Sequence, residues 1–168
     1  MADTDRDQQQ RERECLRKSG VLLSQRDYTC ARLRDKLLAA GFEEEIVEMT
    51  LESLREAHYL DDERYARNFI QAHREDRSRL RIRMDLESRG VQPEIAAGVL
   101  GEEREEFGEE AEIRQIRKLM AKRRFDPLTA TWEERGKMQA FLYRKGYSAS
   151  SVRAAMRAES LDSDGFSV

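Results

Sequence analysis

Three segments of the chain can be laid over one another, and this internal repeat constrains the fold more than any other feature. The segments are LRDKLLAAGF, IRMDLESRGV and MQAFLYRKGY, which begin at residues 33, 82 and 138. Each has an apolar residue eight positions before a glycine and a leucine four positions before it, at Gly41, Gly90 and Gly146. Apolar residues four apart share one helix face, and a glycine just past the last turn ends a helix in the left-handed conformation. The pattern predicts three helices that end at glycines.

A further helix is predicted on either side of each glycine-terminated helix. The preceding segments are CLRKSGVLLSQ, ERYARNFIQAHRED and IRQIRKLMAKRRF, and the following ones are EEIVEMTLESLREA, PEIAAGVLGEE and ASSVRAAMRAE. Thr29, Ser78 and Thr131 are suitable N-caps for the middle helices, Thr131 with Glu134 forms a capping box, and Ser148 suits a later cap. The expected fold class is therefore all-α, with three tandem three-helix repeats forming an elongated, curved array.

The charge distribution divides the chain further. The net charge is only −3, but residues 102–112 carry seven Glu against one Arg, whereas residues 113–158 carry twelve Lys or Arg against three acidic residues. Such segregation indicates a basic working surface beside an acidic hinge. The expected parts are a flexible polar N-terminal tail (1–13), repeat 1 (14–57), repeat 2 (58–101), an acidic linker or helix extension (102–112), basic repeat 3 (113–158) and an acidic C-terminal tail (159–168).

Several classes of protein are not favoured by the sequence. Cys15 and Cys30 have no CxxC spacing, and the chain has only two histidines, so neither a metal site nor a cofactor is expected. The N-terminus lacks the apolar region of a signal peptide, and no apolar run has the length of a membrane span, so we expect a cytoplasmic protein. No phosphate-binding glycine loop and no HExxH motif is present, and helix capping explains the acidic pair Asp61–Asp62, so an enzyme is not expected.

The stretch YLDDERYARNFI, from Tyr59 to Ile70, is the most distinctive in the chain. It resembles the central signature of the RecX family of regulatory proteins. The matching positions are Tyr59, Leu60, Asp61, Asp62, Arg64, Tyr65, Ala66 and Phe69. The resemblance extends upstream to RDYTCARLRDKL and downstream to FLYRKGYS, and so covers residues 15–158. Two positions depart from the family pattern. His58 stands where the family often has glycine, and the SRLR stretch before Ile82 has no glycine where the family commonly has one. Asp61 as a helix N-cap gives the motif a structural role between repeats 1 and 2.

The resemblance implies a specific function. RecX proteins bind RecA assembled on single-stranded DNA, lower its ATPase, strand-exchange and coprotease activities, and so limit recombination and the SOS response. The resemblance therefore implies a regulator of the RecA filament that touches single-stranded DNA directly or through RecA. Apart from the resemblance, we expect a monomer. One alternative is a helical repeat protein that binds nucleic acid without sequence specificity and independently of RecA. Another is a helical scaffold for a different partner.

Basic residues are the candidates for contact with RecA or DNA. They are Arg74, Arg77, Arg79, Arg81, Arg83, Arg114, Arg117, Lys118, Lys122, Arg123, Arg124, Arg144 and Lys145. Positions 114, 117, 118 and 122 form one helical stripe, opposite apolar positions 113, 116, 119 and 120 that are expected to face the core. The alternative for these residues is a solvated charged face. Phe141, Trp132, Tyr143 and Tyr147 are expected to pack in the core, although the last three could instead stack on bases.

Overall fold

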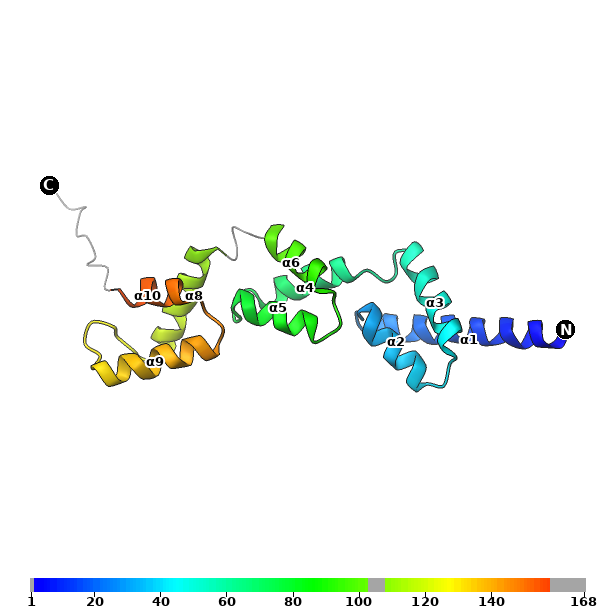
Figure 1. Cartoon of the computed structure of the whole chain (residues 1–168), viewed down its shortest axis with the longest axis horizontal. Coiled ribbons are helices and arrows are strands. Elements are labelled where there is room, and N and C mark those ends of the chain that lie inside the picture. The colour runs from blue at the N-terminus through cyan, green and yellow to red at the C-terminus, as the bar shows by residue number, and fades with distance from the viewer. Residues whose placement is uncertain (1, 103–107, 158–168) are drawn as a thin grey trace. The chain divides into compact units, whose positions relative to one another are not determined.

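The computed structural model describes residues 2–102 and 108–157, and in this part of the chain it contains nine α-helices and no strand (Figure 1). The helices are α1 (Ala2–Gln25), α2 (Cys30–Ala39), α3 (Glu44–Glu56), α4 (Asp62–His73), α5 (Arg79–Glu87), α6 (Pro93–Glu102), α8 (Glu109–Lys122), α9 (Trp132–Arg144) and α10 (Ala149–Met156). They follow one another as three sets of three. The predicted all-α class and its three-helix repeats are confirmed.

The chain forms two compact units. Unit 1 contains Met1–Ala72 and Arg83–Gly101, and unit 2 contains His73–Ile82 and Glu102–Val168. The boundary falls within α5, so the middle helix of the second repeat is shared between the units. A repeat of about 40 residues has too little interior to support a large core by itself.

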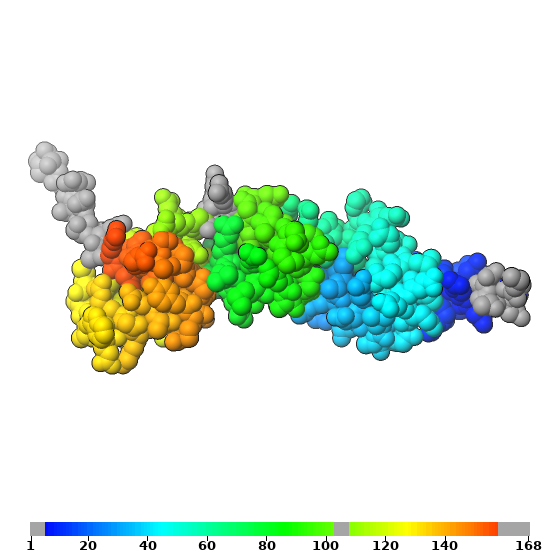
Figure 2. Space-filling model, viewed as in Figure 1, coloured from blue at the N-terminus to red at the C-terminus, as the bar shows by residue number. Residues whose placement is uncertain are grey.

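The first and third repeats each have a distinct hydrophobic core. In the first, Cys15, Leu33, Leu37 and Val47 are fully buried. The core of the third contains Ile116, Leu142 and Val152, which are also fully buried. Figure 2 shows the atoms of α9 and α10 as one continuous surface on this part of unit 2.

The repeated glycines end the middle helices as predicted. Gly41, Gly90 and Gly146 have φ angles of 86°, 82° and 86°. The amide of the next residue then donates to the carbonyl of the leucine at the repeated position. These bonds are Phe42 to Leu37 (3.3 Å), Val91 to Leu86 (3.2 Å) and Tyr147 to Leu142 (3.2 Å). This arrangement returns the apolar residue after each glycine toward the last helical turn, which explains why leucine, glycine and an apolar residue recur together.

The N-caps of the middle helices also join neighbouring repeats. The side chains of Thr29 and Ser78 accept hydrogen bonds from amides in the first turns of α2 and α5, as predicted for caps. In unit 1 the Thr29 hydroxyl also donates to the Arg89 carbonyl at 2.6 Å, and in unit 2 the Ser78 hydroxyl donates to the Lys145 carbonyl at 2.8 Å. Each hydroxyl therefore connects the start of one middle helix to the end of the next.

The N-terminal region differs from the expected flexible tail at residues 1–13. Helix α1 begins at Ala2, so the described part of that tail is helical. Gln10 donates to Glu14 at 2.9 Å, and Arg11 donates to the Gly41 carbonyl at 2.8 Å while lying over the Phe42 ring. Glutamine, arginine and glutamate are good helix formers, so a helix anchored in the core extends through them without apolar periodicity.

The acidic segment 102–112 is partly helical. Glu102 ends α6, and residues 109–112 form the first turn of α8, where acidic side chains complement the helix dipole. Residues 103–107 and the acidic tail expected at 159–168 lie outside the described residues.

Candidate nucleic-acid interface

In unit 2 the segment 73–82 lies against the middle of α8. The Gln115 side chain donates to the Arg74 carbonyl, and the Lys118 ammonium forms an ion pair with Glu75 at 2.9 Å. The hydrogen bond from Lys118 lowers the pKa of Glu75, and the charges of Arg74 and Arg114 lower it further. Glu75 therefore lies among basic side chains that favour its ionised form.

The end of α9 joins the same region. The Ser78 hydroxyl binds the Lys145 carbonyl at 2.8 Å, which brings Arg144 and Lys145 to the start of α5, where Arg79 and Arg81 lie. We call this set of basic residues the junction surface. It consists of Arg74, Arg77, Arg79, Arg81, Arg114, Arg117, Lys118, Arg144 and Lys145. The structure thus brings together candidates that lie up to 71 positions apart in the sequence.

The predicted division of α8 into two faces is confirmed. Ile116 and Met120 are buried, and Ile113 and Leu119 pack against the same core. The basic residues at positions 114, 117, 118 and 122 are all exposed. Arg83 is the one candidate in unit 1, where it forms an ion pair with Glu87 at 2.7 Å.

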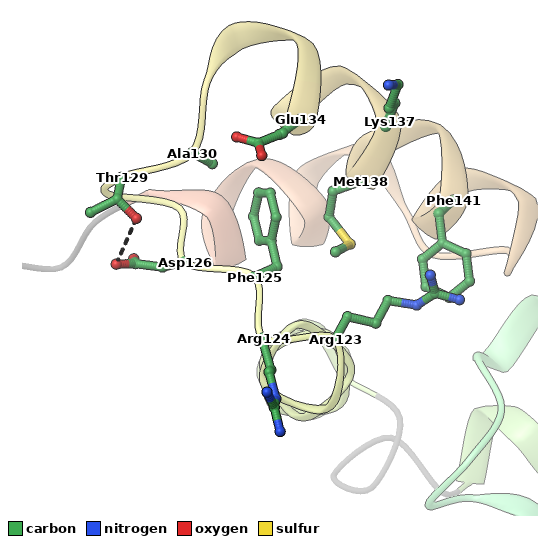
Figure 3. A pocket seen from close by; sticks show the side chains of 10 residues that line it. All are labelled: Arg123, Arg124, Phe125, Asp126, Thr129, Ala130, Glu134, Lys137, Met138 and Phe141. Carbon is green, nitrogen blue, oxygen red and sulfur yellow. Dashed lines mark hydrogen bonds between the residues drawn. The ribbon is translucent and has the colours of Figure 1, made fainter.

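A second basic group lies at the far end of α8, beside a hollow of about 470 Å³ (Figure 3). The Arg123 guanidinium lies over the Phe141 ring at 3.8 Å, and the Lys145 ammonium is 5.8 Å from the same ring. Arg124 has a φ of 53° and points away from the hollow. The stacked Arg123 is held in place by the ring, and a guanidinium so held has a planar edge suited to phosphate or carboxylate.

Polar groups of the loop before α9 are mainly used to shape that loop. The Asp126 carboxylate accepts from the Leu128 amide at 2.9 Å and from the Thr129 hydroxyl at 3.1 Å. Glu134 accepts from the Thr131 amide at 2.8 Å in the predicted capping box, which lowers its pKa. The carboxylates of Asp126 and Glu134 therefore shape the loop. Of the basic residues that line the hollow, Lys137 pairs with Glu133 at 2.7 Å and Arg124 points away, so Arg123 is the basic group held beside it.

The aromatic residues of the third repeat divide into two groups. Tyr147 is buried and Phe141 packs against the core, as predicted. The prediction was wrong for Trp132, which is 90% exposed, and for Tyr143, which is 45% exposed. Trp132 is the first residue of α9, directly after the Thr131 cap, where the side chain has no core to meet. For these two rings, stacking on bases, the alternative weighed from the sequence, stays a prediction. A tryptophan directly after a capping threonine was the available signal for its exposure.

The signature residues fasten the first two repeats together within unit 1. Asp61 accepts from the Arg64 amide at 2.9 Å and so caps α4, as predicted. Asp62 accepts from the Cys30 amide at the start of α2 at 2.8 Å, a contact that the sequence did not predict. His58, where the family often has glycine, has a φ of 58°, which explains the preference for glycine. Leu60 and Ala66 are buried. Tyr59 is 68% exposed, so packing in the core does not explain why a tyrosine stands at this position of the signature.

The remaining sequence predictions concern the two cysteines, a metal site and a membrane span. Burial raises the pKa of the Cys15 and Cys30 thiols, the opposite of what a reactive thiolate requires. Within residues 2–102 and 108–157 no three His, Cys, Asp or Glu side chains are grouped as a metal site would require. No helix in that part of the chain has the length and apolar character needed to cross a bilayer.

The fold is that of a tandem three-helix repeat protein, and its second unit carries a basic surface. Family models of the first, second and third three-helix domains of RecX match residues 16–54, 61–100 and 110–156. The chain belongs to the RecX family of regulatory proteins.

Relatives and solved structures agree with this assignment. Regulatory protein RecX of Trichlorobacter lovleyi is 37% identical over 136 residues, which are 79% of this chain and 86% of the relative. That of Halorhodospira halophila is 33% identical over 85% of this chain and 86% of its own length. The crystal structure of RecX from Lactobacillus salivarius has a TM-score of 0.74 and 17% identity, over 88% of this chain and 95% of that one. The last comparison concerns the fold alone.

Proposed function

We propose that this protein binds the RecA filament on single-stranded DNA and inhibits its ATPase, strand-exchange and coprotease activities. It acts in the cytoplasm as a monomer, by binding and without a cofactor or catalysis. The observation that carries the proposal is the junction surface, where basic residues from three segments of unit 2 meet. Family membership supports the regulatory role, and the resemblance of the sequence to RecX proteins supports RecA as the partner.

The positions of the basic residues suit an extended anionic partner. Arg114 and Lys122 are eight residues apart on one face of α8, which corresponds to about 12 Å along the helix. Arginine predominates, and its planar fork binds phosphate or carboxylate with two hydrogen bonds. Contacts to phosphates position a protein on nucleic acid without reading its sequence, so binding through the DNA backbone without sequence preference is expected.

The test is the rate of ATP hydrolysis by RecA on single-stranded DNA, titrated with this protein. Inhibition well below one copy per RecA supports a filament regulator, because a protein that merely competes for DNA must cover all of it. Inhibition only at amounts that coat the DNA contradicts the proposal. No inhibition at any ratio contradicts it as well.

Charge-removal variants connect this activity to the junction surface. The double variant R79A/R144A removes two of its exposed or half-buried basic side chains, whereas R32A/K36A removes two exposed basic side chains from α2 in unit 1. We expect R79A/R144A to weaken filament binding about tenfold and to reduce the dependence on salt, because each lost phosphate contact lowers the logarithmic salt slope by about 0.7. R32A/K36A should bind like the wild type. Equal loss in both variants would assign the effect to overall charge.

The alternative function is binding to nucleic acid without RecA. It is favoured by Trp132, whose 90% exposed ring offers a stacking surface in the basic third repeat. Fluorescence anisotropy with labelled oligo(dT) in the absence of RecA tests it, with Trp132→Ala as the variant. Tight binding that falls about tenfold in W132A would favour this alternative. If W132A binds oligo(dT) as the wild type does, stacking on this ring makes no contribution.

A further inference from the structure

An apolar groove runs between α1 and α3 in unit 1. It has a volume of about 600 Å³. Its walls are formed by Leu16, Gly20 and Leu23 of α1, Ser53 and Leu54 of α3, and Tyr59 at one end. A hollow of about 220 Å³ continues it past Leu16 and Ser53 toward Met49 and Arg13. The lining positions extend from residue 12 to residue 24 of α1, which corresponds to about 18 Å of helix.

The groove offers an apolar surface to its ligand. Leu16, Met49 and Tyr59 are 48%, 49% and 68% exposed, although all three are large apolar or aromatic side chains. The hydroxyls in the walls are turned back to their own helices, since Ser53 donates to the Met49 carbonyl and Ser24 to the Val21 carbonyl. An exposed apolar surface of this kind, with its polar groups satisfied internally, is typical of a site for another protein.

Gly20 gives the groove its depth. It lies inside α1, where glycine is unfavourable for a helix. A Cβ atom added at this position would meet nothing within 4 Å, so packing within the protein does not require a glycine. A side chain there would project into the groove. The residue therefore keeps open a space that the chain itself leaves unfilled.

Opposite charges border the two sides of the groove. Arg13 and Arg17 are exposed one turn apart on the outer side of the groove on α1, and Arg13 lines the groove's extension together with Glu12. Glu52 and Glu56 are exposed one turn apart on α3, each directly before a residue that lines the groove, and Glu52 also pairs with Arg55 at 3.1 Å. A ligand with an apolar stripe, acidic side chains on one flank and basic side chains on the other would match the floor and both borders. An amphipathic helix has this arrangement, and about 12 residues of helix would fill 18 Å.

We propose that this groove binds an amphipathic α-helix of a partner protein, with Leu16, Gly20 and Tyr59 contacting its apolar face. Arg13 and Arg17 pair with acidic residues on one flank of that helix, and Glu52 and Glu56 pair with basic residues on the other. The site lies in unit 1 and is separate from the junction surface of unit 2. It therefore does not depend on the proposed contact with RecA and DNA.

The test uses a designed helical peptide, with no RecA or nucleic acid present. A fluorescent peptide of about 14 residues carries leucines on one face, glutamates on one flank and lysines on the other. A scrambled peptide of the same composition has no apolar face. We expect the designed peptide to bind at micromolar concentration and at least about tenfold more tightly than the scrambled peptide.

Two adjacent substitutions in α1 locate the bound peptide. Gly20→Glu places a carboxylate in the apolar groove without a clash, whereas Val21→Glu adds the same charge at the neighbouring exposed position, which does not line the groove. We expect G20E to weaken peptide binding at least about tenfold and V21E to bind as the wild type does. Circular dichroism of both variants checks that the helices are intact.

Three results would overturn the proposal. They are no binding of the designed peptide by the wild type, equal binding of the scrambled peptide, and equal effects of G20E and V21E. A fourth concerns the occupant of the groove. If sedimentation shows a dimer of the wild type at micromolar concentration that G20E dissociates, the groove is occupied by a second copy of this chain and not by another protein.

Discussion

The first and third repeats have the same internal plan but different outer surfaces. Cys15 and Ser19 of α1 are buried in the first repeat, and Ile116 and Met120 of α8 are buried in the third. Beyond these buried residues, α1 contributes Leu16 to the wall of the apolar groove, whereas α8 exposes Arg117 among other basic residues. The first helix thus carries an apolar groove wall in the first repeat and a basic stripe in the third.

This difference indicates that the repeat plan does not determine which residues stand on the exposed face of its first helix. Leucine, glycine and the following apolar residue are needed to end the middle helix, and they recur in both repeats. The face of the first helix that points away from the core has no such task. The first repeat is therefore suited to an apolar protein partner, whereas the third is suited to an anionic partner.

The largest expected effect tests the common plan. Leu37 and Leu142 occupy the same repeat position, and both are fully buried. Each Leu→Ala variant should lose about 3 kcal/mol of stability, because it removes buried apolar contacts and leaves a cavity. Native-state hydrogen exchange measures this as the opening free energy of α2 for L37A and of α9 for L142A. A loss below about 1 kcal/mol in only one variant would show that the two cores are not equivalent.

The common plan is also the part that could be predicted from sequence. Gly41, Gly90 and Gly146 are predictable because helix termination is a local property of a few adjacent residues. The same holds for the caps at Thr29 and Ser78, which bind amides three residues away.

What could not be predicted depends on distances between elements. The groove arises from the separation of α1 and α3, and the bond from Thr29 to the Arg89 carbonyl spans 60 residues. Neither leaves a periodic pattern. The junction surface was predicted only as separate basic clusters, because bringing Arg144 near Arg79 requires the Ser78–Lys145 contact.

The second prediction uses a difference in the residue that follows the repeated glycine. This residue is Phe42 in the first repeat and Tyr147 in the third. Burial, with the charges of Glu112 and Asp76, raises the pKa of Tyr147 from 10.0 to about 12. The phenol ionises near pH 10 in the unfolded chain but only near 12 in the folded protein. Its protonated form therefore stabilises the fold fully below pH 10, and this contribution is lost as the pH rises toward 12.

The expected loss is about 2 kcal/mol between these pH values. Urea unfolding at pH 9 and near pH 12 measures it, and Tyr147→Phe should lose less stability over the same interval. Absorbance at 295 nm provides an independent measurement, since one tyrosine should titrate late in the wild type and that step should be absent in Y147F. An unchanged titration in Y147F would assign the late step to another tyrosine.

The third prediction compares the glycines themselves. Gly41 and Gly146 have the same φ of 86°, but an added Cβ meets nothing at Gly41 and would lie 2.8 Å from the Ser78 hydroxyl oxygen at Gly146. Gly41→Ala should cost about 1 kcal/mol from the left-handed backbone alone. Gly146→Ala should cost about 1 kcal/mol more, because the bond from Ser78 to the Lys145 carbonyl must also shift. Hydrogen exchange of α2 and α9 measures both, and equal costs would show that the Ser78 contact yields without strain.

The smallest expected effect distinguishes a threonine that only caps a helix from one that also connects two repeats. Thr131 caps α9 and its hydroxyl donates to Glu134 in its own helix, whereas the Thr29 hydroxyl donates to Arg89 of the next repeat. Thr131→Ala should therefore lose about 1 kcal/mol, the usual value of an N-cap. Thr29→Ala should lose about 1 kcal/mol more, since it also leaves a carbonyl without its donor. Thr29→Ser, which keeps the hydroxyl, should recover most of that loss in urea unfolding. If T29A and T131A lose the same amount, the contact between repeats adds nothing to the cap, and the first two repeats are held together mainly by Asp62 and their apolar contacts.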